Sequence, residues 1–265
     1  LWYYEIFTVI ELWIAMLLGT VIGLIVTKKV KMIDMPQLVG LLNGFGGSAS
    51  MIAGMLTLVN GNDIDAFSLI TAGLAIVVGG LTLSGSVVAA GKLHKVFPQR
   101  PIILRYHQFW TSFTLAISLI TVPLFAIPFF QETGPQILLI IVASLASLAF
   151  GVIFAIRVGG ADMPITISLL NSLSGVAGSI AGLAIQDILL VAVGGIVGAS
   201  GLLLTQIMCK SMNRRLIDIL LGKTSVVTGG KKAPSASTPQ AEPTKTIAAK
   251  ESPADWLKNA QKVII

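Results

Sequence analysis

Two asparagines hold equivalent positions in two similar apolar stretches, and their amides are the first side chains here that could do chemistry. A stretch that begins at Asp34 and another that begins at Asp162 are identical at eleven of 22 aligned positions. Both contain Leu-Leu-Asn, with Asn43 in the first copy and Asn171 in the second. Because a polar side chain is costly inside a membrane segment, it is usually kept there for helix packing or for transport.

Each asparagine heads a row of small residues at helical spacing. The rows are Asn43, Gly47, Ser50 and Gly54 in the first copy, and Asn171, Gly175, Gly178 and Gly182 in the second. In one interpretation the rows are packing surfaces, since small residues let helices approach and an asparagine can bond across the interface. In the other, the amides orient water along a narrow polar path, to which Ser86 would add a hydroxyl.

Two aspartates and an arginine are candidates for the end of such a path. Asp34 and Asp162 each precede Met-Pro, a pattern typical of helix N-caps, where a carboxylate also suits the helix dipole. The same carboxylates are placed to accept a proton at an exit, and Asp162 follows the flexible pair Gly159-Gly160. Arg214 is either a membrane anchor or a coupling residue beneath an adjoining domain. Both interpretations stay open for each residue.

The composition places these residues in an integral membrane protein. Of the 265 residues, 54% are hydrophobic and 11% are charged, whereas a soluble domain has about 25% charged residues. The net charge of +6 is spread over loops and the tail. No basic run is interleaved with aromatic residues, which argues against a nucleic-acid partner. The single cysteine, Cys209, excludes an intrachain disulfide, and no Cys/His cluster predicts a metal or haem site.

Seven apolar runs are long enough to cross a bilayer as helices. They are residues 8–27, 36–59, 66–91, 109–130, 135–157, 164–185 and 187–208. Lys and Arg follow the first, third, fifth and seventh runs, and acidic residues occupy the alternate turns. The positive-inside rule therefore predicts an external N-terminus and a cytoplasmic C-terminus. Lys92, His94 and His107 are expected in the basic cytoplasmic loop that joins the third and fourth helices.

The predicted fold class is an all-α integral membrane protein of about seven transmembrane helices with a parallel internal repeat of three helices. The repeat covers the first three and the last three helices. Because equivalent helices of the two copies are four helices apart in the chain, an even number, both units are expected to run in the same direction. Ser84-Gly85 and Ser200-Gly201 form a weaker match between the third helix of each unit.

The composition changes abruptly at Gly222 and predicts three regions. Residues 1–222 form a transmembrane domain, and residues 223–252 are rich in Ala, Pro, Ser, Thr and Lys, a composition typical of a flexible linker. Residues 253–265 contain a short amphipathic helix and the start of a strand, which predicts the beginning of a truncated soluble domain. The chain starts at Leu1 and not at a methionine, so we expect it to be part of a longer protein.

Several separate motifs resemble the β subunit of proton-translocating NAD(P)+ transhydrogenase. They are Leu83 to Leu93, Asp162-Met163-Pro164, Leu170-Asn171-Ser172 with Gly175, Met208 to Arg214, and Trp256 to Ile265. The resemblance implies that residues 1–222 carry protons while hydride passes between NADH and NADP+ in soluble domains. It implies that residues 253–265 begin the NADP(H)-binding domain. NADP(H) and NAD(H) would be substrates bound by domains that this chain lacks, and no metal or haem is implied.

The resemblance also implies partners and a location. An NAD(H)-binding α subunit would contribute its own membrane helices, and the complete enzyme would be a homodimer in a lipid bilayer. The membrane would be the bacterial cytoplasmic (inner) membrane or, alternatively, the mitochondrial inner membrane. Within the chain, protons would pass Asn43, Ser86 and Asn171 and leave near Asp162, with Asp34 and Arg214 at the same exit.

Asn43 departs from the family pattern, because many members have a histidine there and an asparagine cannot titrate. Either water held by Asn43, Ser86 and Asn171 relays the proton, or a histidine or acid on a partner subunit replaces the missing group. A non-enzymatic small-solute or ion transporter built from parallel repeats is the competing hypothesis. It explains the duplication equally well, but it does not explain a linker that leads into a further domain.

Overall fold

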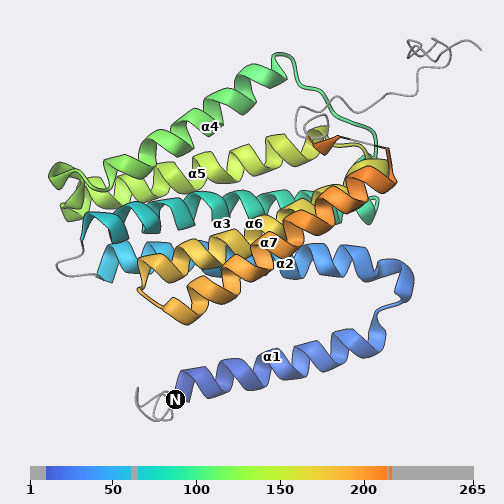
Figure 1. Ribbon diagram of the computed structural model, residues 1–265, viewed down its shortest axis with the longest axis horizontal. Helices are drawn as coiled ribbons and strands as arrows, with labels where there is room; N and C mark the ends of the chain where they lie inside the picture. Colours follow the sequence, from blue (N-terminus) through green and yellow to red (C-terminus); the bar gives the residue numbers. More distant parts are fainter. Residues whose placement is uncertain (1–9, 61–64, 214, 217–265) are drawn as a thin grey trace, which may run out of the picture. The chain divides into compact units, whose positions relative to one another are not determined.

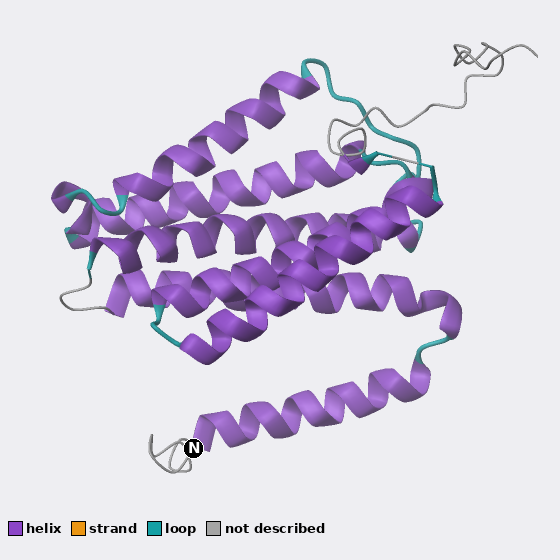
Figure 2. Ribbon diagram, in the orientation of Figure 1, coloured by secondary structure: helices purple, strands orange, loops and turns teal. Residues whose placement is uncertain are grey.

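The computed structural model describes residues 10–60, 65–213 and 215–216, which form helices and the loops between them (Figures 1 and 2). The α-helices are α1 (Ile10–Lys29), α2 (Met35–Asn60), α3 (Ala66–Leu93), α4 (His107–Leu124), α5 (Thr133–Arg157), α6 (Met163–Ala184) and α7 (Ile188–Ser211). Three short 3-10 turns are η3 (Met32–Asp34), η4 (Pro128–Gln131) and η5 (Gly160–Asp162). Arg214, the predicted linker 223–252 and the predicted domain start 253–265 lie outside the described residues.

The predicted all-α membrane fold is confirmed, with one difference at α4. Six of the helices are long and apolar enough to cross a membrane, and α4 is not among them. The sequence predicted a helix over residues 109–130, but α4 spans 18 residues and ends at Leu124, directly after Pro123. A proline inside a helix removes a backbone hydrogen bond, and the chain then continues into η4.

The two copies of the internal repeat share the same local structure, and their helices run in the same direction. A 3-10 turn that ends in aspartate precedes each repeated helix, η3 before α2 and η5 before α6. Figure 1 shows α2 and α6 running in the same direction, as the parallel repeat predicts. Each repeated helix packs along the next one in the chain, α2 on α3 and α6 on α7.

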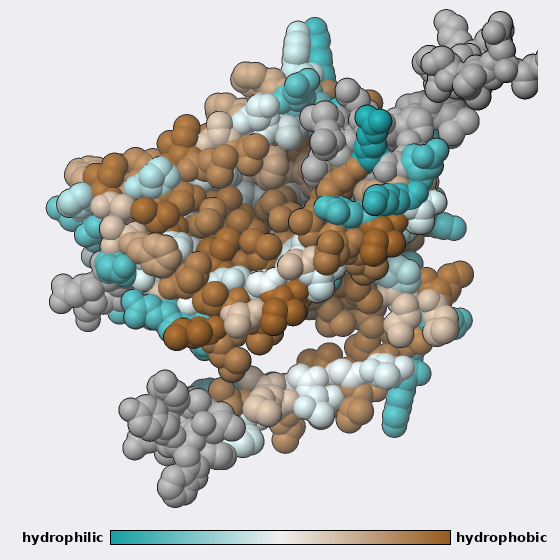
Figure 3. Space-filling model, in the orientation of Figure 1, coloured by the Kyte–Doolittle hydropathy of each residue, from teal (hydrophilic) through white to brown (hydrophobic). Residues whose placement is uncertain are grey.

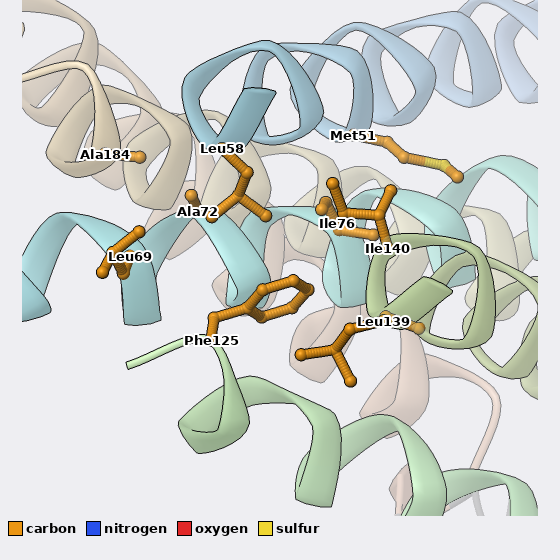
Figure 4. Packing of buried hydrophobic residues seen from close by; sticks show 10 residues of the cluster. Met51, Leu58, Leu69, Ala72, Ile76, Phe125, Leu139, Ile140 and Ala184 are labelled. Carbon is orange, nitrogen blue, oxygen red and sulfur yellow. The ribbon is translucent and has the colours of Figure 1, made fainter. Parts of the chain in front are cut away.

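Helix α3 is the central element of the bundle, in contact with α2, α4, α5 and α6. By contrast, α1 has no buried residue. One apolar cluster contains Met51, Leu58, Leu69, Ala72, Ile76, Phe125, Leu139, Ile140, Ala143 and Ala184 (Figure 4). Gly73 makes room for the Phe125 ring, since a β-carbon at that glycine would lie 2.5 Å from Phe125 Cδ2.

We call the end of the bundle at which α1, α3, α5 and α7 terminate the basic end. Its helices carry Lys28, Lys29, Lys92, Arg157 and Lys210 in their last turns. On the face shown in Figure 3, apolar residues cover the middle of the helices and polar residues gather toward their ends. Such a banded surface is typical of helices that cross a bilayer.

Two basic-loop predictions are wrong. Lys92 lies inside α3, which continues to Leu93, and its side chain is fully buried. His107 is the first residue of α4 and is also buried. In both cases the helix extends beyond the apolar run that predicted it, because packing at the basic end covers residues that composition alone assigns to a loop. His94 is exposed, as expected, and its Nδ1 lies 2.9 Å from Gln37 Oε1.

Candidate functional site

Asn43 and Ser86 form a buried polar pair between α2 and α3. The Asn43 Nδ2 atom donates a hydrogen bond of 2.8 Å to Ser86 Oγ. The exposed fractions of the two residues are 7% and 0%. Within the described part of the chain, Asn43 Oδ1 has no hydrogen-bond partner. A buried carbonyl oxygen without a partner costs about 1–3 kcal/mol, so this oxygen is a favourable site for a water or for a donor from another chain.

Glycines bring the two helices close enough for that bond. A β-carbon at Gly47 would lie 2.8 Å from the Gly79 carbonyl oxygen and 2.9 Å from Thr82 Cβ. One turn earlier, a β-carbon at Gly44 would lie 3.3 Å from Ser86 Cβ. A β-carbon does not fit at the separations found at Gly47, so α2 and α3 pack backbone to backbone there.

Asn171, the repeat equivalent of Asn43, occupies a different environment. Its side chain is exposed and lines a groove of about 450 Å³ between α2, α6 and α7. By the match of Ser84-Gly85 with Ser200-Gly201, the α7 residue that corresponds to Ser86 is Leu202, which has no hydroxyl to offer. The structure therefore brings together Asn43 and Ser86 and leaves Asn171 outside that pair.

Between α6 and α7, hydroxyl groups make the interhelical hydrogen bonds, whereas between α2 and α3 the Asn43 amide makes one. Ser172 Oγ donates to the Gly198 carbonyl at 2.6 Å, and the Ser168 and Thr205 hydroxyl oxygens lie 2.9 Å apart. Ser172 belongs to the Leu170-Asn171-Ser172 motif, whereas Ser168 and Thr205 belong to none of the motifs described above. Membrane hydroxyls usually bond within their own helix, so the sequence carries no signal that these bonds cross between helices.

The glycine rows serve packing at most positions. A β-carbon at Gly54 would collide with the Ala72 carbonyl oxygen of α3. A β-carbon at the repeat equivalent, Gly182, would collide with the Val191 amide nitrogen of α7. Gly178 is different, because a β-carbon there would meet no atom within 4 Å; it lines the same groove as Asn171. The packing interpretation thus describes most of the glycines, while Asn171 and Gly178 border open space.

The two repeated aspartates end the 3-10 turns at the basic end. Asp162 is 3% exposed and occupies the N-cap position of α6, but its side chain makes no capping hydrogen bond. Asp34 is half-buried and borders a cavity of about 330 Å³ together with Gln37 and His94. Across the described ranges, no three His, Cys, Asp or Glu side chains converge to hold a metal ion.

The turn that carries Asp162 is tied to its neighbours on two sides. Lys92 Nζ donates to the carbonyl oxygens of Ile156 and Val158, the latter at 2.7 Å. The Gly160 amide donates to the Gln99 carbonyl at 2.8 Å. Carbonyls at a helix C-terminus carry partial negative charge, so the end of α5 stabilises the buried ammonium group.

An apolar cluster includes residues that neighbour Ser86 and Asp162 along the chain. We call it the basic-end cluster, and its buried members are Ala89, Val158, Met163, Ile165, Ile167, Leu170 and Cys209. Ala89 follows Ser86 by one turn of α3, and Met163 directly follows Asp162. A β-carbon at Gly85 would lie 3.0 Å from Leu170 Cδ2, so α6 packs its apolar side chains directly against the helix that holds Ser86.

The fold and the buried amide–hydroxyl pair define a helical membrane protein with a duplicated helix unit. Residues 3–265 match the family model described as NAD(P) transhydrogenase beta subunit. The NAD(P) transhydrogenase subunit beta of Rhodospirillum rubrum is 34% identical over 260 residues, which cover 95% of this chain and 54% of that relative. A second sequence of that species, from a culture-collection strain, has the same identity and coverage.

The chain therefore belongs to the NAD(P) transhydrogenase β-subunit family. It spans about half the length of the curated relatives it matches, at 54% of each. The resemblance predicted from the motifs is confirmed over nearly the whole chain. This assignment does not favour the competing hypothesis of a non-enzymatic transporter.

Proposed function

We propose that this chain is the proton-conducting membrane part of an NAD(P) transhydrogenase, which couples proton movement to hydride transfer between NADH and NADP+. The observation that carries the proposal is the buried Asn43–Ser86 pair in a chain of this family. Among the described residues Asn43 Oδ1 has no partner, so it can accept a further hydrogen bond, and a hydroxyl both donates and accepts. An amide and a hydroxyl side by side can orient water without themselves titrating.

The proposed path runs from the external side to the Asn43–Ser86 pair and leaves near Asp162. Asn171 would join the path through the groove that it lines with α2 and α7. A membrane helix of the NAD(H)-binding α subunit would fill this groove and complete the path. Asp34 and Arg214 would act with Asp162 in coupling at the exit. The apolar basic-end cluster supports an exit that opens only with a conformational change.

Hydride transfer would take place in soluble domains beyond the membrane part. In this proposal residues 1–222 form the membrane domain, 223–252 the linker, and 253–265 the beginning of the NADP(H)-binding domain. NADP(H) and NAD(H) are bound as substrates by that domain and by the α subunit, and the complete enzyme is a homodimer. It lies in a bacterial cytoplasmic membrane with its C-terminus cytoplasmic, an orientation supported by the lysines and arginines at the basic end.

The membrane potential supplies enough free energy for such coupling. Moving one charge through about 100 mV supplies about 2.3 kcal/mol. Since about 1.4 kcal/mol changes an equilibrium tenfold, this shifts a two-state equilibrium of the NADP(H) domain by more than tenfold. Conformational coupling between the exit and that domain is therefore sufficient, without chemistry inside the membrane.

The test uses the complete β chain with its α partner, reconstituted in sealed liposomes that contain a pH dye. Hydride transfer from NADPH to an NAD analogue should acidify the lumen in the wild type. Asn43→Leu should reduce that acidification by at least about tenfold, because it removes the only amide of the buried pair. Asn60→Leu, the same substitution at the exposed end of α2, is the matched control. Full acidification by Asn43→Leu would contradict the proposed path.

A further inference from the structure

Lys92 is a fully buried cation to which the proposed path assigns no role. Its exposed fraction is 0%, and its ammonium group donates to the carbonyl oxygens of Ile156 and Val158. Taking an ammonium group out of water costs several kcal/mol unless hydrogen bonds and opposite charge offset the loss. The last carbonyls of α5 provide both. The lysine is therefore held in one specific arrangement.

The arrangement helps to hold a segment that contains two consecutive glycines. Val158 is 1% exposed and belongs to the basic-end cluster. After it the chain passes through Gly159-Gly160 to Asp162, and glycines add backbone freedom. The Lys92 bonds tie this segment to α3, while the Gly160–Gln99 backbone bond and the bond from the Ile102 amide to the Ile156 carbonyl tie it to the loop that follows α3.

Lys92 and Ser86 share one rigid element. Both lie on α3, six residues apart, which is less than two helical turns. Ser86, at one end of this stretch, forms the hydrogen bond with Asn43. Lys92, at the other end, donates to backbone carbonyls just before the turn that carries Asp162. The basic-end cluster includes Ala89, one turn from Ser86 on α3, and Val158, whose carbonyl oxygen accepts a hydrogen bond from Lys92.

We infer that Lys92 is a positioning residue that keeps the proton exit closed, by holding Val158 in the basic-end cluster and the Asp162 turn against α3. This inference rests on the proposed function. When the Lys92 hydrogen bonds are intact, the cluster stays dry and separates the Asn43–Ser86 pair from Asp162. When they are lost, the turn separates from α3 and water enters between the pair and the aspartate.

The chain contains its own reporter for this opening. Cys209 is its single cysteine, lies in the basic-end cluster and is 4% exposed. A water-soluble maleimide reacts with this thiol only when water reaches the cluster. Labelling is read as the modified fraction of the Cys209 peptide by mass spectrometry, which separates it from cysteines in other domains or subunits.

The experiment compares Lys92→Met, Lys92→Arg and wild type in the complete enzyme in liposomes, without nucleotide. Passive proton flux is driven by a potassium diffusion potential, and Cys209 labelling is measured on the same samples. Lys92→Met should raise both by at least about tenfold, since a hydrogen bond to a charged group contributes more than that to an equilibrium. Lys92→Arg keeps the donors and should stay near wild type. Lys210→Met removes an exposed charge at the same end and should change neither.

Unchanged flux and labelling in Lys92→Met would overturn the inference. If Lys92→Met does not assemble, Val158→Ala with Lys92 intact provides the second test, because it removes the cluster contact that Lys92 holds. It should raise Cys209 labelling and flux, and no increase would equally overturn the inference. Failure of the proposed function looks different: the wild type would not acidify the liposomes during hydride transfer, while Cys209 labelling would still depend on Lys92.

Discussion

At position 43 the chain places a side chain that donates and accepts hydrogen bonds but carries no titratable proton. Its donor is used by Ser86 and its carbonyl oxygen has no partner among the described residues. On the proposed path, a proton that passes this point therefore travels on water or on a hydroxyl. In the proposed relay Ser86 is therefore as important as Asn43, because among the described residues it is the hydroxyl bonded to that amide.

Ser86→Ala is expected to lower both stability and proton pumping. It leaves the buried Asn43 N–H without its acceptor, which costs about 1–3 kcal/mol. Ser118→Ala is the matched control, because Ser118 is equally buried but bonds to Thr114 of its own helix. Thermal unfolding and liposome acidification would be measured for both variants. Equal effects of the two changes would show that the Asn43–Ser86 bond has no special role.

At the scale of helices, the two repeat units use the same close packing for different polar contacts. Gly175 of α6 approaches the Gly198 amide of α7 as Gly47 of α2 approaches Gly79 of α3. The α2–α3 pair then holds an amide–hydroxyl bond, whereas α6 and α7 are joined by Ser172 and other hydroxyls. Duplication therefore kept the packing and specialised the polar residues.

Gly175→Ala and Gly178→Ala are expected to differ sharply although they lie one turn apart on α6. A β-carbon at Gly175 would lie 2.5 Å from the Gly198 amide nitrogen, whereas one at Gly178 meets nothing within 4 Å. The first change should cost about 1–3 kcal/mol through overpacking. The second should be neutral or stabilising, because alanine favours helix. Thermal unfolding of the purified β chain measures both, and similar melting temperatures would contradict the close α6–α7 contact.

At the scale of the whole molecule, charge sets the expected orientation. Lysines and arginines cluster in the last turns of α1, α3, α5 and α7, while Glu132 and Asp187 lie at the other end. The basic end is therefore expected to face the cytoplasm. This places Asp34 and Asp162 on the side where the C-terminal tail emerges, as coupling to a soluble domain requires.

Labelling of single introduced cysteines tests that orientation. Glu132 and Arg105 are both exposed and lie at opposite ends of the bundle. A membrane-impermeant maleimide should label Glu132→Cys in intact bacterial cells, and Arg105→Cys only after the cells are permeabilised. Native Cys209 is buried and serves as the unreactive internal control. The reverse pattern would invert the proposed topology and move the proton exit to the external side.

Much of the fold is determined by the sequence itself. Long apolar runs leave a helix as the way to satisfy backbone groups in a bilayer, so the number and order of the helices follow directly. The repeat and the even offset of four helices between its copies likewise determine that α2 and α6 run parallel. The helix ends were less predictable, because α3 extends past Gly91 to cover Lys92 and α4 stops short near Pro123.

Tertiary structure alone decided which polar residues meet. The repeat makes Asn43 and Asn171 equivalent in sequence, yet one is buried against Ser86 and the other faces a groove. Helical spacing identifies the residues that share a face, but it does not identify what the neighbouring helix offers to that face. For the same reason the sequence assigned Lys92 to an exposed loop, whereas the end of α5 provides the carbonyls that allow it to be buried.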